Sequence, residues 1–151
     1  MKKFLLIPVV LLLAVTGYAQ LNNSWIDYSK TYYKFKLAKD TLSRINQPVL
    51  AAAGLGSVPA EHFQLWRNGK QVRLFTSVPS GIMSSGDFME FWGELNDGKP
   101  DRALYRNPDY QLDDRYSLET DTAAYFLTVN PAGGNLRYVT APNNTATNTL
   151  P

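Results

Sequence analysis

The sequence predicts an all-β fold, a two-sheet sandwich of jelly-roll type with one short helix, and three observations lead to it. Residues 86–98 hold the densest run of large apolar side chains outside the N-terminus, with glycines at both edges. Residues 63–75 show a hairpin pattern around Asn68-Gly69. Residues 123–129 form a third apolar run after a polar turn. Short apolar runs separated by turn residues are typical of antiparallel β-proteins.

The N-terminus carries the marks of a secretory signal peptide at residues 1–19. Two lysines precede an apolar run at residues 4–15, and small residues come before Gln20. The apolar run is too short for a membrane-spanning helix, which needs about 20 residues. We therefore expect cleavage between Ala19 and Gln20. The product would be exported through the inner membrane to the periplasm, the outer membrane or the cell surface.

Charge and composition exclude several classes of function. The chain has 15 basic and 13 acidic side chains, and loss of Lys2 and Lys3 with the signal peptide leaves 13 of each. Such a neutral domain lacks the basic surface that binds nucleic acids or anionic membranes. We expect no nucleic-acid partner and no membrane span in the mature chain. With no cysteine and one histidine, His62, the chain has no thiol nucleophile and no multi-histidine zinc site.

The first elements follow from local patterns. Residues 33–37 alternate large apolar side chains with lysines, which predicts a strand with one buried and one solvated face. Residues 42–45 are expected to form a second short strand. Residues 48–54 predict a short helix, since Pro48 suits its first turn, an alanine run continues it and Gly54 ends it.

The hairpin at residues 63–75 is built on Asn68-Gly69, the preferred pair for a two-residue type I′ turn because both residues tolerate positive φ. This turn predicts the cross-strand pairs Arg67–Lys70, Trp66–Gln71, Leu65–Val72 and Phe63–Leu74. Leu65 and Val72 then share the buried face.

The second half of the chain predicts further strands around the central run. We interpret residues 86–98 as a strand buried on both faces. Weaker strands are expected at residues 104–105 and 110–118, followed by strands at residues 123–129 and 136–139. From Pro142 the composition is too polar to order itself.

Three segments are therefore expected. They are a signal peptide at residues 1–19, a β-sandwich module at residues 20–140 and a linker at residues 141–151. We expect a further domain to follow the linker.

Several ordered segments together resemble a known family. They are Trp25-Ile26-Asp27-Tyr28, Tyr33-Lys34-Phe35-Lys36-Leu37, Phe63-Gln64-Leu65-Trp66-Arg67-Asn68-Gly69-Lys70, Asp87-Phe88-Met89-Glu90-Phe91-Trp92-Gly93, Asn96-Asp97-Gly98, Asp101, Leu104-Tyr105 and Asp121-Thr122-Ala123-Ala124-Tyr125-Phe126-Leu127-Thr128. In order and spacing the chain resembles the N-terminal region of gingipain-type cysteine peptidases of the Bacteroidota, most of all PorU-like sortases of the type IX secretion system. The resemblance spans residues 25–140.

The resemblance implies a β-rich, prodomain-like module that precedes a caspase-like peptidase domain. The Cys–His pair of the family would lie in that downstream domain, as would cleavage of C-terminal secretion signals and their attachment to the cell surface. This chain would be non-catalytic and would assist folding of the peptidase domain or cover it. Its partners would be that domain and other type IX secretion components. The alternative is a free-standing cell-surface or periplasmic β-sandwich that binds a glycan or a protein.

Paired carboxylates and a lone histidine are the candidates for catalysis. Glu90 and Glu94 lie four residues apart, whereas a glycosidase needs two carboxyl groups that converge in a cleft. We interpret Glu90 as a structural, partly buried acid, satisfied by an arginine or a backbone amide. His62 is expected to lie beside the hairpin, opposite Phe75, with no nucleophile beside it. No catalytic residue is predicted in this chain.

Oxygen ligands at Asn96, Asp97 and Asp101 would suit Ca²⁺. Their spacing differs from an EF-hand loop, and Asn-Asp-Gly is sufficient for a turn. We predict no metal and no cofactor, with calcium binding at these three residues left open.

Aromatic side chains offer a possible platform for a sugar. Trp92 and the tyrosines fit the core better, because aromatics at strand spacing usually pack inward. Trp66 falls on the hairpin face opposite Leu65, so it is the predicted ligand-facing residue.

Overall fold

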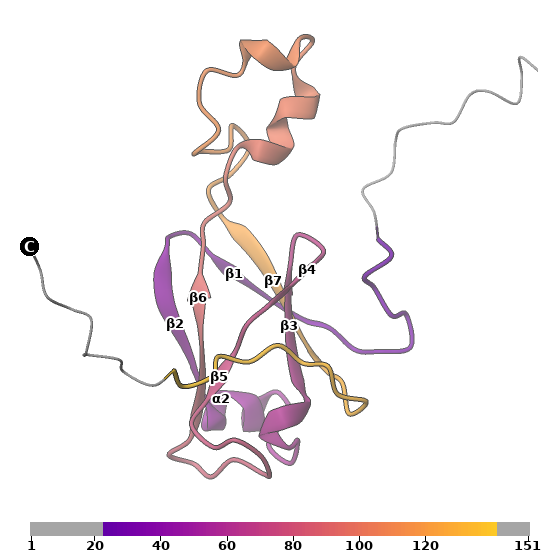
Figure 1. The fold of residues 1–151 in the computed structure, drawn as a ribbon, viewed down its shortest axis with the longest axis vertical. Helices are drawn as coiled ribbons and strands as arrows, with labels where there is room; N and C mark the ends of the chain where they lie inside the picture. The colour runs from indigo at the N-terminus through magenta and orange to yellow at the C-terminus, as the bar shows by residue number, and fades with distance from the viewer. Residues whose placement is uncertain (1–22, 142–151) are drawn as a thin grey trace, which may run out of the picture.

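The computed structural model describes residues 23–141 and contains two antiparallel β-sheets that pack face to face (Figure 1). The all-β prediction is confirmed at this level. The predicted signal peptide, its cleavage site at Ala19 and Gln20, and residues 142–151 of the predicted linker lie outside the described residues.

The larger sheet has four strands in the order β1-β7-β3-β4. Their bounds are Tyr33–Leu37, Ala123–Val129, Phe63–Arg67 and Lys70–Val72, respectively. Because β7 lies between β1 and β3, Leu127 stands opposite Tyr33 on one side and Leu65 on the other. The predicted strands at residues 33–37 and 123–129 are confirmed.

The smaller sheet has three strands in the order β2-β6-β5. Their bounds are Thr41–Asn46, Phe88–Gly93 and Phe75–Thr76. The chain changes sheet at both sides of the molecule, from β1 to β2 through residues 38–40 and from β4 to β5 through residues 73–74. Each of these short crossings joins an edge strand of one sheet to an edge strand of the other.

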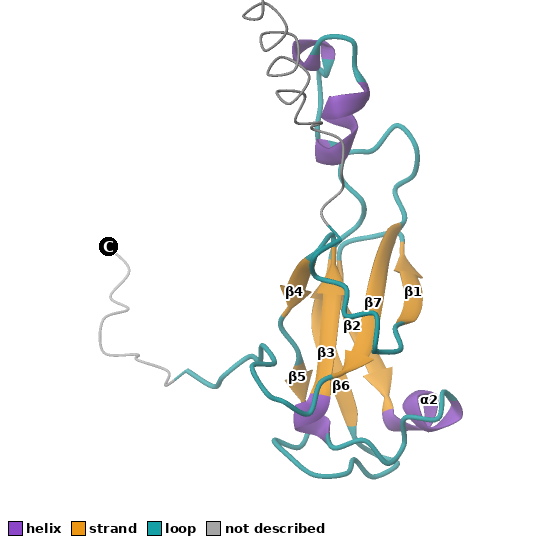
Figure 2. Cartoon of the chain, turned by 90° about the vertical axis from the view of Figure 1, so that its right-hand side faces the viewer, coloured by secondary structure: helices purple, strands orange, loops and turns teal. Residues whose placement is uncertain are grey.

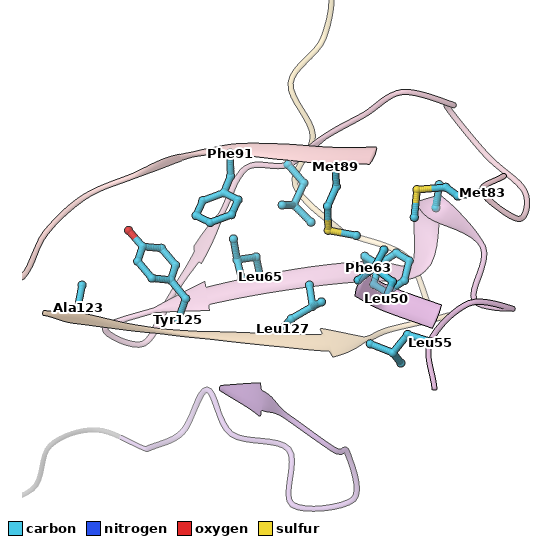
Figure 3. Close-up of a cluster of buried hydrophobic side chains, with 12 residues drawn as sticks. Leu50, Leu55, Phe63, Leu65, Met83, Met89, Phe91, Ala123, Tyr125 and Leu127 are labelled. Atoms are coloured by element: carbon cyan, nitrogen blue, oxygen red, sulfur yellow. The ribbon is translucent and has the colours of Figure 1, made fainter. Parts of the chain in front are cut away.

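The core fills the space between the sheets. Met89 and Phe91 point from β6 toward Leu65 of β3 and Tyr125 of β7 (Figure 3). The ring centroids of Phe91 and Tyr125 lie 5.3 Å apart, and Phe35 of β1 stacks on Tyr125 at 5.6 Å. Burying each such side chain contributes roughly 1.5–3 kcal/mol, so this layer holds the two sheets together.

Strand β6 corrects one prediction, because it is buried on one face only. Met89 and Phe91 face the core, whereas Trp92 is 50% exposed. The neighbouring sheet covers just one side of β6. An antiparallel sheet with one solvated face needs alternation rather than a continuous apolar strand.

The short helix is confirmed as α2, Gln47–Ala52. It ends in a Schellman motif, in which the Leu55 amide donates to the Leu50 carbonyl at 2.8 Å and the Gly54 amide donates to the Ala51 carbonyl at 3.0 Å. Gly54 has φ +80°, the left-handed conformation that this cap requires. Leu50 and Leu55 are both buried, so the cap also fixes the helix on the core.

The hairpin prediction is confirmed next to the turn and wrong at its far end. Asn68 and Gly69 have φ 48° and 72°, as a type I′ turn requires. The pairs Leu65–Val72, Trp66–Gln71 and Arg67–Lys70 form as predicted. Phe63 does not face Leu74, because the chain leaves the sheet after Val72 to reach β5 in the other sheet.

Phe63 pairs with Val129 instead, and Leu74 forms a bridge to Arg137. The Leu74 amide donates to the Leu136 carbonyl at 3.2 Å, and the Tyr138 amide donates to the Leu74 carbonyl at 2.9 Å. The predicted strand at residues 136–139 is thus reduced to one parallel bridge. It lies along the crossing between β4 and β5.

The weaker strands predicted at residues 104–105 and 110–118 do not form. That region contains the 3₁₀ turns η2, Lys99–Leu104, and η3, Pro108–Tyr110, and otherwise loop. Pro100 and Pro108 at the starts of these turns favour φ near −65° and supply no amide for a strand ladder. A further 3₁₀ turn, η1 (Ala60–His62), leads into β3.

Candidate functional site

The most distinctive feature of the fold is the insert, defined here as residues 94–122 between β6 and β7. It projects from one end of the two sheets (Figures 1 and 2). Its two arms are joined by the Asn96 amide, which donates to the Asp121 carbonyl at 2.8 Å, and by the Gly98 amide, which donates to the Asp114 carbonyl at 2.8 Å. The insert is therefore a closed loop with a narrow neck.

Asp101 organises the interior of the insert. It is 5% exposed, and its Oδ2 accepts hydrogen bonds from Ser117 Oγ and from the Leu118 amide, both at 2.8 Å. Gln111 Nε2 donates to the Gly98 carbonyl at 2.6 Å. These contacts hold the loop in one shape although it contains no regular strand or α-helix.

The outer surface of the insert is unusually apolar. Five large apolar side chains there are between 63% and 98% exposed, namely Leu104, Tyr110, Leu112, Tyr116 and Leu118. Single exposed apolar residues are ordinary, whereas five on one projecting loop make the insert a candidate interaction surface.

At the neck, two adjoining pockets share a wall made of Arg67, Glu94, Asp97 and Lys99, and we call this region the neck groove. The shared wall contains two ion pairs. Arg67 Nη1 donates to Glu94 Oε2 at 3.1 Å, and Lys99 Nζ donates to Asp97 Oδ2 at 3.0 Å. Arg67 Nη2 also donates to the Leu95 carbonyl at 2.5 Å.

The two pockets differ in what surrounds this wall. The insert-side pocket, of about 390 Å³, is flanked by Asp40, Asp114, Arg115 and Tyr116. The sheet-edge pocket, of about 490 Å³, is flanked by β4 and by the segment that bridges to Leu74. Its lining includes Lys70, Gln71, Arg73, Trp92 and Tyr138. Both volumes fall in the range of roughly 300–1,000 Å³ that is usual for ligand pockets.

Tyr125 fixes the position of Glu94 at the floor of the groove. Its hydroxyl accepts from the Glu94 amide at 2.7 Å and donates to the Glu94 carbonyl at 3.0 Å. Burial raises the pKa of Tyr125, so the hydroxyl remains protonated and able to donate. A core tyrosine of β7 thereby holds the point where the chain leaves β6.

Two buried nitrogen atoms at the groove lack hydrogen-bond partners, Nε of Arg67 and Nε2 of Gln71. Both residues line the sheet-edge pocket. An unpaired buried donor costs roughly 1–3 kcal/mol, and both atoms lie beneath the surface that lines the pocket.

The predicted structural role of Glu90 matches its surroundings. Arg44 Nη2 lies 2.7 Å from Glu90 Oε1, and the Arg44 guanidinium lies over the Phe88 ring at 3.8 Å. Glu94 pairs with Arg67 instead. The two carboxylates therefore serve separate ion pairs and do not form a catalytic pair.

His62 lies in η1, where its carbonyl accepts from the Asn130 amide at 2.7 Å. The expectation that it faces Phe75 is wrong, because β5 belongs to the other sheet and Phe75 pairs with Glu90. The sheet crossing at residues 73–74 separates the two residues.

The candidate calcium ligands have other partners. Asn96 Nδ2 donates to the Thr120 carbonyl at 2.9 Å, Asp97 pairs with Lys99, and Asp101 binds Ser117 and Leu118. Within residues 23–141, no group of histidine, cysteine or acidic side chains is placed to hold a metal ion.

Trp66 lies beneath another aromatic residue. Its ring centroid is 5.4 Å from that of Trp25, and Trp25 also packs on Phe126 at 5.5 Å. Ligand contact by Trp66 stays a prediction.

The expectation that Trp92 lies in the core is wrong, because its side chain is half exposed at the groove. Strict alternation from the buried Phe91 would have placed it outward. No sequence signal could have predicted that Trp92 and Tyr138 line the same pocket, because the two residues are distant in the chain.

Comparison of the chain with protein-family models, curated proteins and solved structures found no match. The resemblance to gingipain-type peptidases is therefore carried by the sequence segments alone. In the part of the chain that the structure describes, no helix has the length and apolar character to cross a membrane.

Proposed function

We propose that this chain is a non-catalytic N-terminal module of an exported, PorU-like gingipain-type peptidase of the type IX secretion system, and that it docks on the downstream peptidase domain. The proposal has three further parts. The sandwich is of jelly-roll type, residues 1–19 are an export signal, and the module also contacts other secretion components. The observation that carries it is the exposed apolar surface of the insert.

The physical argument begins with the rigidity of the insert. Asp101 and the neck hydrogen bonds hold Leu112 and Leu118 on a shaped loop, so little ordering entropy is lost when a partner covers them. Their exposures are 98% and 76%. A protein partner with an apolar recess would remove this surface from water, at about 25 cal/mol per Å² of apolar area.

The chemistry of the chain supports recognition rather than catalysis. The sequence contains no cysteine, and its one histidine sits beside β3. At the neck groove, Glu94 and Asp97 are engaged by Arg67 and Lys99. A carboxylate held by a cation is a weak base, whereas a nucleophile needs an adjacent base to activate it.

Inhibition in trans tests the proposal. The purified chain from Gln20 should bind the downstream peptidase domain and slow its cleavage of a peptide substrate. Replacing Leu112 and Leu118 together with serine should weaken inhibition at least about tenfold, because two apolar contacts are lost. The matched control is Ile82→Ser, which changes a 64% exposed apolar residue outside the insert. Equal inhibition by all three proteins, or none by the unaltered chain, would reject the docking role.

A further inference from the structure

We propose that the neck groove binds an acidic oligosaccharide, that is, a chain of pyranose sugars bearing carboxylates. This proposal gives the groove a ligand of its own and does not depend on docking to a peptidase domain. The groove residues involved are separate from Leu112 and Leu118, so the two proposals fail independently.

Exposed aromatic rings along the groove are the first argument. Tyr116 lines the insert-side pocket, and Trp92 and Tyr138 line the sheet-edge pocket. They are 63%, 50% and 48% exposed. Exposed flat rings suit the C–H faces of pyranose sugars, since both surfaces are apolar. Trp92 stands on the solvated face of β6, opposite Leu42, so the core does not explain it.

The polar wall between these rings is the second argument. The Arg67–Glu94 and Lys99–Asp97 pairs present donors and acceptors side by side, already oriented by their mutual contacts. Vicinal sugar hydroxyls both donate and accept, so they match such a wall. The donors are pre-positioned, which lowers the entropy cost of binding.

The charge of the sheet-edge pocket selects an acidic sugar, whereas the insert-side pocket also contains Asp40 and Asp114. Within residues 23–141, neither Lys70 nor Arg73 belongs to an ion pair, and both line the sheet-edge pocket. The acids of that pocket, Glu94 and Asp97, are already paired. Lys70 and Arg73 therefore have no carboxylate partner, although Arg73 Nη1 donates to the Arg137 carbonyl at 3.3 Å. A ligand carboxylate would form charge-assisted hydrogen bonds with these two cations, which are stronger than neutral ones.

A peptide fits this groove less well. The aliphatic side chains that line its two pockets are few, chiefly Leu95, Val72 and Pro100. Apolar peptide side chains would therefore find no deep recess, and their removal from water would contribute little.

Calorimetry with defined oligosaccharides tests the proposal on the whole exported chain. The probes are oligogalacturonate, oligoalginate and hyaluronan fragments, and the neutral counterpart is fully methyl-esterified oligogalacturonate. We expect at least one acidic probe to bind, with affinity that falls as salt rises. For a galacturonate binder the methyl ester should bind at least about tenfold more weakly. Failure of all three acidic probes, or equal binding of acid and ester, would overturn the proposal.

Two variants locate the site. Trp92→Ala should weaken the affinity by at least about tenfold for each probe that the unaltered chain binds. Lys70→Gln with Arg73→Gln should reduce binding of the acidic probe and leave any residual binding of the ester unchanged. The matched control is Tyr28→Ala, which removes an aromatic ring that is 83% exposed outside the groove. Far-ultraviolet circular dichroism confirms folding of each variant. Unaltered affinity in folded Trp92→Ala and in the double variant would place the binding elsewhere and overturn the proposal.

Discussion

At the scale of residues, two side chains connect the sheets to the neck groove. Tyr125 is 1% exposed in the core, yet its hydroxyl reaches the end of β6 and binds both backbone groups of Glu94. Arg67 continues this connection to Glu94 and Leu95. One tyrosine and one arginine therefore link the core to the neck of the insert.

Removing the Tyr125 hydroxyl should destabilise the fold. Tyr125→Phe leaves the Glu94 amide and carbonyl without this partner, so the free energy of unfolding should fall by about 1–3 kcal/mol. Urea denaturation measures the change. The control Tyr110→Phe lies on the exposed insert surface and should change stability by less than about 0.5 kcal/mol. Equal stability of Tyr125→Phe and the unaltered chain would contradict the assigned role.

Ionisation of the same hydroxyl predicts how the stability of the fold changes with pH. Burial raises the pKa of Tyr125 above its ordinary value of 10.0. Its contribution to stability is then present below pH 10 and is lost as the pH rises through the higher folded-state pKa. Tyr125→Phe should therefore lose less stability above pH 10 than the unaltered chain.

At the scale of elements, the insert and the two sheets differ in what stabilises them. The sheets share an apolar core, whereas the insert depends on Asp101, Gln111 and backbone hydrogen bonds at the neck. Local polar contacts are weaker than core burial, so the insert should open at lower free energy than the strands.

Replacement of Asp101 tests that difference. Asp101→Ala leaves Ser117 Oγ and the Leu118 amide unpaired, which should cost roughly 1–3 kcal/mol within the insert. Hydrogen exchange should accelerate at residues 99–118 and stay nearly unchanged in β3 and β7. Asp109→Ala is the control, since its carboxylate is exposed and meets only the exposed Arg102. Uniform acceleration across the molecule would show that the insert is not a separate unit.

For the whole molecule, the local sequence predicted elements better than their connections. Asn68-Gly69 predicted the hairpin register, and Gly54 predicted the helix end, because positive φ is a local property. Phe63 and Leu74 were paired wrongly, since the chain changes sheet between Val72 and Phe75. A sheet crossing depends on packing across the core, which alternation within one strand cannot reveal.

The sequence by itself therefore determined the alternating faces of residues 33–37, the type I′ turn and the helix cap, since each depends on side-chain period or on local φ preference. Only the tertiary structure showed that residues 94–122 form a projecting insert and that the neck groove lies at its base. The groove needs Arg67 from β3, Glu94 after β6 and Tyr138 beside Leu74. These residues are distant in the chain and meet only because the sheets pack face to face, which is a property of the whole core rather than of any segment.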